Sequence, residues 1–390
     1  MKHLCLLPLF GLLLAGSLSG QDPFFTHFYG NEALFNPALT GYRGALSFSL
    51  KAKQQWDAED ADGYHTYALV AEESLPCSFF DYGLSLLQDT EGAGKLRTQQ
   101  FGGMLAAPLR LSAPTAKNLA QLRIGIGLHW GQQYIDYSRL LFIDQLHPKY
   151  GLMGPDGLPI PSAFSPPNEG FSNWYFLPSG GFSFRYIVNP RSKYASNITT
   201  GIALHNLVPW TGANGRGHSW SVLGLGAPTV PRLTYFFRWE KVLGYMGRNF
   251  VSVRPQLFVQ SQRGIAYLEG GLDVSFSRQF TGSFYLHTSR PNEGLSSTNW
   301  ASIQVETGFF PGPSSRIDLG LGYSFNTSGL RNFVNNIFEL TLRFSFASSP
   351  LCSLAGDPPA YSKNRPMPCP TIRESSGKNK IYENIWYNND

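Results

Sequence analysis

The residues of this sequence that could do chemistry are one acidic cluster, a few isolated histidines and serines, and the cysteines. The cluster DAEDADG at 57–63 concentrates carboxylates and suggests a divalent-cation site. Its spacing does not fit an EF-hand loop, because the twelfth position counted from Asp57 is Ala68 rather than a carboxylate. We therefore interpret the cluster as a solvated loop.

His129 and Ser324 fall on the polar faces of predicted strands, where a barrel phospholipase carries its serine and histidine. Nothing in the sequence brings the two together, so we interpret them as polar lining. The net charge of +5 is diffuse and argues against nucleic-acid binding. The sequence predicts no enzyme, no cofactor and no metal site.

The N-terminal residues 1–20 predict a secretory signal peptide, with Lys2 and His3 before an apolar run. Three cysteines follow it: Cys77, Cys352 and Cys369. Their odd number forbids complete pairing. Cys352 and Cys369 can close a disulfide loop in an oxidising compartment, and unpaired thiols are the alternative.

The composition after this segment favours an outer-membrane β-barrel. Charged residues make up 15%, below the usual ~25% of a soluble domain. Aromatics reach 14% and glycines number 41, while the mean hydropathy of −0.16 is unlike that of a helical membrane protein. A barrel with an apolar lipid face and a polar lumen has such a composition.

Alternation of apolar and polar residues recurs along the chain. In LRIGIGLHWGQ, Ile124, Ile126 and Leu128 share one face, and Gly125 and Gly127 share the other. Most such segments reach the roughly 9–11 residues that a tilted membrane strand needs. About fourteen strands are predicted, at 43–56, 64–75, 81–89, 97–111, 119–134, 174–188, 196–207, 231–244, 249–261, 264–276, 279–290, 297–310, 316–326 and 335–347.

The connections alternate in length, as in bacterial barrels with long outer loops and short periplasmic turns. Odd-numbered connections include the long segments 135–173 and 208–230. An even strand number places both termini in the periplasm. The predicted organisation is a signal peptide (1–20), an N-terminal plug segment (21–42), an all-β transmembrane barrel (43–347) and a periplasmic tail (348–390).

Two groups of residues are candidates for function. A lumen of this width leaks unless it is filled, and the aromatic N-terminal segment can fold into it. The plug candidates are Phe24, Phe25, Phe28, Tyr29, Phe35, Asn36 and Pro37. Exposed aromatic and aliphatic groups in outer loops mark partner-binding surfaces. Those candidates are Tyr134, Tyr137, Leu140, Leu141, Phe142, Trp174 and Tyr175.

Several stretches resemble the PorP/SprF family of type IX secretion system proteins. They are Gln21-Asp22-Pro23, NPALTGYRG (36–44), Trp56, YGLSLLQDTEG (82–92), LRIGIGLHWGQQYIDYSRLLFIDQ (122–145) and the closing hairpin at 317–346. The hairpin departs from the family pattern, with Phe325-Asn326 and Phe338-Glu339 where Tyr-Ser-Tyr-Asp and His-Glu are frequent.

The resemblance implies an integral outer-membrane barrel of gliding and secreting Bacteroidota-type bacteria. It implies two kinds of protein partner: a secreted, adhesin-like cargo held through its C-terminal domain, and the secretion machinery. Outer-membrane lipid surrounds such a barrel. A FadL-like passive channel or transporter for small hydrophobic solutes is the alternative, because plugged fourteen-stranded barrels also carry fatty acids.

Overall fold

The computed structural model describes most of the chain between residues 22 and 346. The described residues are 22, 25–28, 30–43, 46–56, 63–75, 78–112, 117–165, 167–189, 194–207, 222, 230–246, 249–262, 265–277, 279–291, 298–312, 315–327 and 336–346. The acidic residues 57–62, the three cysteines Cys77, Cys352 and Cys369, and the tail 348–390 lie outside them.

The described residues contain fourteen β-strands, most of them longer than ten residues. They are β1 (Ser47–Gln55), β2 (Tyr64–Ser74), β3 (Asp81–Glu91), β4 (Leu96–Arg110), β5 (Leu119–Tyr134), β6 (Tyr175–Val188), β7 (Ser196–His205), β8 (Arg232–Met246), β9 (Asn249–Gln262), β10 (Ile265–Phe276), β11 (Phe280–Pro291), β12 (Thr298–Gly312), β13 (Ser315–Asn326) and β14 (Ile337–Phe346). The predicted strands correspond to these one by one.

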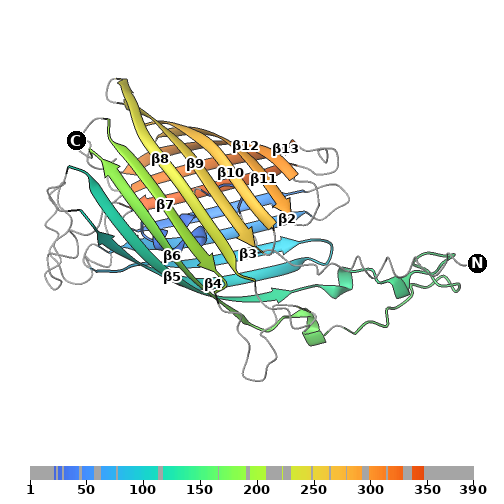
Figure 1. Ribbon diagram of the computed structural model, residues 1–390. Helices are drawn as coiled ribbons and strands as arrows, with labels where there is room; N and C mark the ends of the chain where they lie inside the picture. Colours follow the sequence, from blue (N-terminus) through green and yellow to red (C-terminus); the bar gives the residue numbers. More distant parts are fainter. Residues whose placement is uncertain are drawn as a thin grey trace, which may run out of the picture.

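The strands form one closed barrel (Figure 1). Each strand pairs antiparallel with the next in the chain, and β14 pairs with β1 from Ser47 opposite Ser345 to Gln55 opposite Ile337. Closure pairs the two strands that would otherwise be edges, as a lipid environment requires. The predicted fold class, an antiparallel barrel of about fourteen strands, is confirmed.

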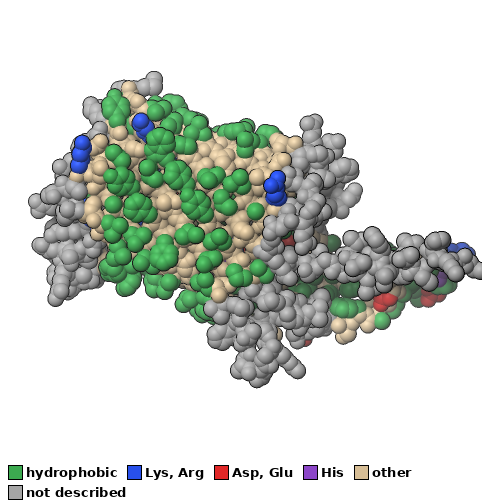
Figure 2. Space-filling model, viewed as in Figure 1, with side chains coloured by type: hydrophobic (Ala, Val, Ile, Leu, Met, Phe, Trp, Pro, Cys, Tyr) green, Lys and Arg blue, Asp and Glu red, His purple; other side chains and the backbone are tan. Residues whose placement is uncertain are grey.

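The two faces of the wall differ as the alternation predicted. In β5, Ile126 is 52% exposed on the outer surface, whereas Gly127 is buried toward the lumen. Leu84 and Leu321 are likewise about 60% and 59% exposed on the outside. Figure 2 shows hydrophobic side chains spread over the strands, with Lys and Arg near the two ends of the barrel. The lumen face carries most of the buried polar and charged side chains.

The N-terminal segment, defined here as described residues 25–28 and 30–43, contains α2 (Glu32–Phe35) and η1 (Pro37–Leu39). Its hydrogen bonds reach strands around the ring, including β1 and β14, β5 and β6, and β7 and β8. The segment is therefore enclosed by the wall, and its blue helical turn is visible between the strands in Figure 1.

The chain enters the lumen from the end that carries the odd-numbered connections. Asp22 Oδ2 accepts a hydrogen bond from Asn206 at 2.9 Å and lies 3.3 Å from Arg232 Nη1, and the Asp22 N–H donates to Gln262 at 3.2 Å. These partners stand where β7 ends, β8 begins and β9 ends. Asp22 is therefore at the opposite end of the barrel from Phe346.

The position of Asp22 corrects the expectation that both termini lie at the same end of the barrel. The even strand count places the start of β1 and the end of β14 at one end, and the Phe346 N–H indeed donates to Leu46 there at 2.9 Å. The described start of the chain lies at the other end, because residues 25–43 cross the lumen before β1 begins. A strand count fixes where the strands end but leaves the course of a segment outside the sheet open.

The long loop between β5 and β6 is structured. It holds η2 (Tyr137–Arg139), η3 (Ile143–Gln145) and η4 (Pro167–Gly170), and isolated bridges join His147 to Gly151 and Met153 to Pro159. We call residues 135–173 the arm. In Figure 1 the arm extends well beyond the strand ends, at the right of the view. It lies at the same end of the barrel as Asp22.

Candidate functional site in the lumen and on the arm

Aromatic side chains form the apolar core between the N-terminal segment and the wall. Phe25, Phe28 and Phe35 of the segment are each at most 5% exposed. Phe28 stacks on Phe236 of β8 and Phe258 of β9, with ring centroids 4.9 and 5.3 Å apart. Aromatic pairs at such distances add to the free energy of burial. The other two aromatic candidates from the sequence, Phe24 and Tyr29, lie outside the described residues.

The Asn36-Pro37 turn binds the wall through its backbone and its amide. Asn36 Oδ1 accepts the Ala38 N–H at 2.9 Å, which caps η1, and Pro37 occupies the first helical position, where no N–H is needed. Asn36 Nδ2 donates to the carbonyls of Phe182 at 3.0 Å and Ile202 at 3.3 Å. One side chain therefore closes the turn and joins it to β6 and β7.

Three glycines on neighbouring strands make room for this turn. A Cβ atom on Gly125 of β5 would lie 2.2 Å from both the Ala38 nitrogen and the Pro37 carbonyl carbon. At Gly181 of β6 it would lie 2.3 Å from Asn36 Oδ1, and at Gly201 of β7 it would lie 2.9 Å from Asn36 Nδ2. Only residues without a side chain let two backbones approach this closely.

Arg123 of β5 joins the end of the segment to the wall. Its Nε donates to the Ala38 carbonyl at 2.8 Å, and its Nη2 donates to the Thr40 carbonyl and to Asp81 of β3, the latter at 2.8 Å. Both ion-pair side chains are at most 3% exposed. These hydrogen bonds compensate for the lost hydration of the buried guanidinium, and they attach the segment to β5 and β3 at once.

Tyr42 forms a second attachment near the start of β1. The guanidinium carbons of Arg185 and Arg238 lie 5.0 and 5.7 Å from the centroid of its ring. Its hydroxyl lies 3.1 Å from Thr199 Oγ1 and accepts a hydrogen bond from Arg238 Nη2 at 3.1 Å. Cation–π contacts of this kind strengthen when they are removed from water.

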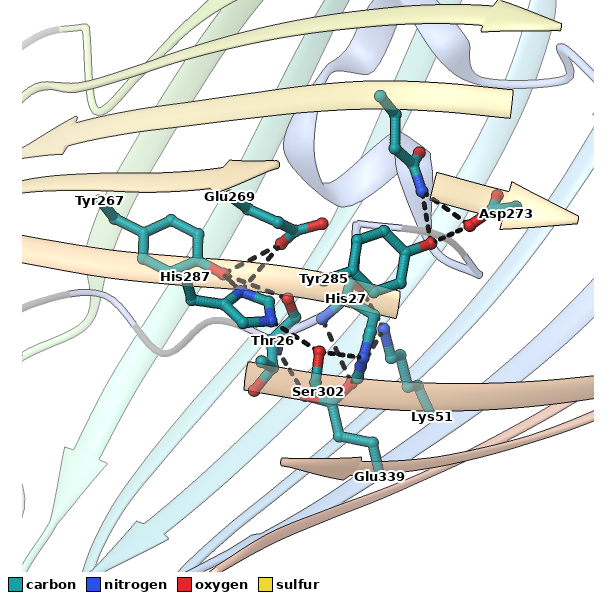
Figure 3. Close-up of polar contacts among 11 residues, drawn as sticks. Thr26, His27, Lys51, Tyr267, Glu269, Asp273, Tyr285, His287, Ser302 and Glu339 are labelled. Carbon is teal, nitrogen blue, oxygen red and sulfur yellow. Dashed lines mark hydrogen bonds and ion pairs between the residues drawn. The ribbon is translucent and has the colours of Figure 1, made fainter. Parts of the chain in front are cut away.

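A buried polar network holds the first residues of the segment (Figure 3). Glu339 of β14 accepts the N–H groups of Thr26 and His27, and its Oε2 lies 2.8 Å from His27 Nδ1. Lys51 of β1 donates to the His27 carbonyl and lies 3.4 Å from Glu339. The carboxylate is thus satisfied by backbone and side-chain donors from both the segment and the wall.

The network continues through Ser302 of β12. Its Oγ lies 3.1 Å from His27 Nε2 and 2.6 Å from His287 Nε2. His287 Nδ1 in turn lies 2.8 Å from the Tyr267 hydroxyl, which is also 2.9 Å from Glu269 Oε2 and 3.2 Å from the Thr26 carbonyl oxygen. Four strands, β1, β10, β12 and β14, thereby contact two consecutive residues of the segment, and His287 of β11 links two of them.

Ser302, His27 and Glu339 have the connectivity of a nucleophile, a base and an orienting carboxylate. Ser302 is fully buried, however, and its hydroxyl contacts two imidazoles, so a substrate has no approach to it in this structure. His129 and Ser324, which we interpreted from the sequence as polar lining, do not form such a pair: His129 Nε2 lies 2.9 Å from Ser85 Oγ, and Ser324 Oγ has no hydrogen-bond partner among the described residues.

A small cavity remains between the segment and the wall near Asp22. It has a volume of about 60 Å³ and is lined by Phe35, Leu177, His205 and Arg232 among others. Its lining is mostly apolar, with His205 and Arg232 among the polar groups that reach it. Among the described residues there is no group of three His, Cys, Asp or Glu side chains arranged to hold a metal ion, and no helix long and apolar enough to cross a membrane.

The arm is held together at its base and middle by aromatic contacts. Tyr134 packs on Phe171 with ring centroids 4.7 Å apart, and Phe164 stacks on Phe142 at 4.7 Å and contacts Tyr137 at 5.1 Å. Tyr134, Tyr137 and Phe142, which the sequence proposed as partner contacts, are consequently half-buried, and Leu140 is half-buried beside Gly94 between β3 and β4.

Asp144 links the two limbs of the arm. Its carboxylate accepts the Ala163 N–H at 2.7 Å and the Ser162 hydroxyl at 3.0 Å. The Ala163 N–H, with help from Ser162, holds the pKa of the Asp144 carboxyl below its usual value, because both donors favour the charged form. The arm is therefore a defined shape rather than an open loop.

Other apolar side chains of the arm face outward. Ile143 is 89% exposed, Leu158 64% and Leu141 56%, and Trp174 at the start of β6 is 51% exposed. Tyr175 differs from the expectation: it is 3% exposed and faces the lumen, with its ring against Gly131. The strand begins at Tyr175, so the alternation turns this side chain inward and leaves Trp174 outside.

Comparison with known proteins identifies one family. Residues 17–344 match the family described as "Type IX secretion system membrane protein PorP/SprF". No curated protein matches the chain.

Solved barrel structures match at low identity. They include the CymD monoaromatic hydrocarbon channel (8% identity, 82% of this chain and 93% of that chain, TM-score 0.42). Others are the KdgM porin (7%, 77% and 99%, TM-score 0.32) and OprB of Pseudomonas putida (9%, 85% and 100%, TM-score 0.32). These TM-scores are too low for the channels to inform on this chain.

Proposed function

Because the chain belongs to the PorP/SprF family of type IX secretion system membrane proteins, we propose that it is an outer-membrane barrel that retains a secreted protein at the cell surface. The arm carries this proposal. It is braced internally, it extends past the strand ends, and it exposes Ile143, Leu141 and Leu158. Apolar groups fixed in an exposed position contribute strongly to an interface when a partner covers them.

The partner in this proposal is an adhesin-like cargo protein, bound through its C-terminal domain, and the barrel works alongside the secretion machinery. The end that bears the arm faces the outside, as long loops do in bacterial barrels. The chain is not an enzyme in this proposal. A route for small hydrophobic solutes is the competing function, and the experiments below separate the two.

The N-terminal segment is the plug of the barrel in this proposal. A fourteen-stranded wall encloses a lumen wide enough to conduct. The aromatic core around Phe28, the turn at Asn36 and the attachment at Arg123 fill this space and are distributed along its length. A filled lumen is compatible with a protein that holds a partner at its outer end.

The proposal predicts that residues 146–170 are needed for surface retention but not for folding. Excising a loop between sheet residues that remain paired leaves the wall intact. In cells carrying this deletion, we expect one large secreted protein to move from the surface to the medium, as measured by comparing the two proteomes. Migration of unboiled and boiled samples on gels checks that the barrel is folded.

A single substitution in the arm tests the same proposal more specifically. Ile143→Asp places a charge on a side chain that contacts little of the arm, so it should release the same protein without unfolding anything. Ser165→Asp, at another exposed position of the arm, is the matched control and should retain it. If no secreted protein changes place in either variant while solute uptake falls in the deletion, the barrel is a transporter.

The course of the N-terminal segment predicts where tags become accessible. A short epitope inserted between Gln21 and Asp22 should bind antibody on intact cells, together with an epitope placed in the arm, because Asp22 lies at the arm end. An epitope after Phe346 should bind only after permeabilisation. An N-terminal epitope that behaves like the C-terminal one would contradict this topology.

A further inference from the structure

The outer face of the barrel is indented where β1 meets β14. The groove has a volume of about 710 Å³ and spans β2, β1, β14, β13 and β12. Its walls are outward-facing apolar side chains, among them Tyr67, Leu340 and Leu321, which are 41–59% exposed. Volumes of roughly 300–1,000 Å³ are those of ligand-binding pockets.

A small residue creates the indentation. Ala52 of β1 stands between two larger cross-strand partners, Leu340 of β14 and Tyr67 of β2. Neighbouring positions on one face of a sheet lie side by side, so one methyl group between two long side chains leaves a furrow between them. Val305 and Ile303 of β12 extend the apolar lining further around the barrel.

The lining of the groove includes polar side chains toward the arm end of the barrel. Gln54 and His65, which are cross-strand partners, line that end of it and both face outward. Trp56 and Tyr64 lie beyond them, with ring centroids 5.2 Å apart, and Trp56 is 40% exposed. Such aromatic residues mark the level of the lipid head groups. On β1 and β2 the groove thus lies next to that level, and from there it extends across the sheet to β12.

We propose that this groove binds one acyl chain of a membrane lipid, with the polar head of that lipid beside Gln54 and His65. The lining faces the hydrocarbon of the membrane, so the occupant is a hydrocarbon chain. Amide and imidazole N–H groups at the head-group level can donate hydrogen bonds to phosphate or ester oxygens.

Packing rather than the hydrophobic effect retains the chain. Lipid tails are as apolar as the groove, so leaving the bilayer gains no transfer free energy. A chain lying between Tyr67 and Leu340 has protein atoms on three sides, and the summed dispersion contacts exceed those with mobile neighbours. This bound lipid would cover the seam at which the barrel closes, opposite the luminal Lys51–Glu339 contact.

Native mass spectrometry of the barrel purified in mild detergent tests the proposal. The wild-type protein should retain one lipid, whose mass identifies it. Ala52→Trp fills the furrow, and the affinity for the lipid should fall by about fivefold to a hundredfold, as expected for an overpacked contact of 1–3 kcal/mol. Ala71→Trp, which makes the same change on the outer face of β2 outside the groove, should retain the lipid.

Photolabelling of the wild-type protein supplies a test that requires no variant. The barrel is reconstituted with a phosphatidylethanolamine that carries a diazirine in one acyl chain. Labelled peptides should come from β1, β2, β13 and β14. Even labelling around all fourteen strands, equal lipid retention in both tryptophan variants, or no retained lipid in the wild type would overturn the proposal. None of these results bears on cargo retention by the arm.

Discussion

Gly125→Leu is expected to make the barrel conduct ions by displacing the N-terminal segment from the lumen. A side chain at this position meets the backbone of Pro37 and Ala38, and a Cβ at 2.2 Å cannot be accommodated by rotating a neighbouring side chain. The wall is fixed by two ladders of hydrogen bonds, with Gly125 paired to Gly181 and Ala106. The N-terminal segment, which is held by fewer bonds, should therefore move away.

The measurement is conductance in a planar lipid bilayer, with the wild-type protein giving no steady current. Gly103→Leu is the matched control, because Gly103 lies on β4, faces outward, and has no atom closer than 3.9 Å to an added Cβ. It should behave as the wild type. A folded Gly125→Leu barrel that stays silent would show that the segment is not what closes the lumen.

Arg123→Met is expected to cost about 3–5 kcal/mol of the free energy of unfolding, as does removal of one partner of a buried ion pair. The substitution leaves Asp81 buried without its guanidinium, and the carbonyls of Ala38 and Thr40 lose a donor. The measurement is the denaturant midpoint of the detergent-solubilised barrel.

Two comparisons make this result specific. Arg139→Met removes the same group from an exposed pair on the arm, where Arg139 lies 3.7 Å from Asp136 and is half exposed. Its cost should be about 0–1 kcal/mol. The double variant Arg123→Met with Asp81→Leu should recover part of the loss, because no charge is then left buried. Equal losses in the two single variants would contradict a role for burial.

Strand number, facing and fold class could be read from the sequence because they depend on local order. A period of two places Ile126 outside and Gly127 inside wherever the strand sits, and turn residues delimit each strand. Phe25, Phe28 and Phe35, which precede β1, are buried. That they plug the lumen stays a prediction from the sequence.

The partners of these residues could not be read from the sequence. Thr26 and His27 meet Glu339 more than 300 positions away, and His27 shares Ser302 with His287. The one available signal was the alternating glycines of LRIGIG, whose inward facing hinted at a close backbone approach at Gly125.

The sequence alone thus determined the barrel wall, because the alternation within each strand shows which of its faces is polar. Tertiary structure decided which strands the N-terminal segment contacts and which side chains near the strand ends face outward. Closure of β14 on β1 brings Glu339 and Lys51 to the same two residues of the N-terminal segment. The start of β6 at Tyr175 turns that ring inward and leaves Trp174 outside. Contacts between residues distant in the chain depend on the curvature and register of the whole barrel, which no local pattern encodes.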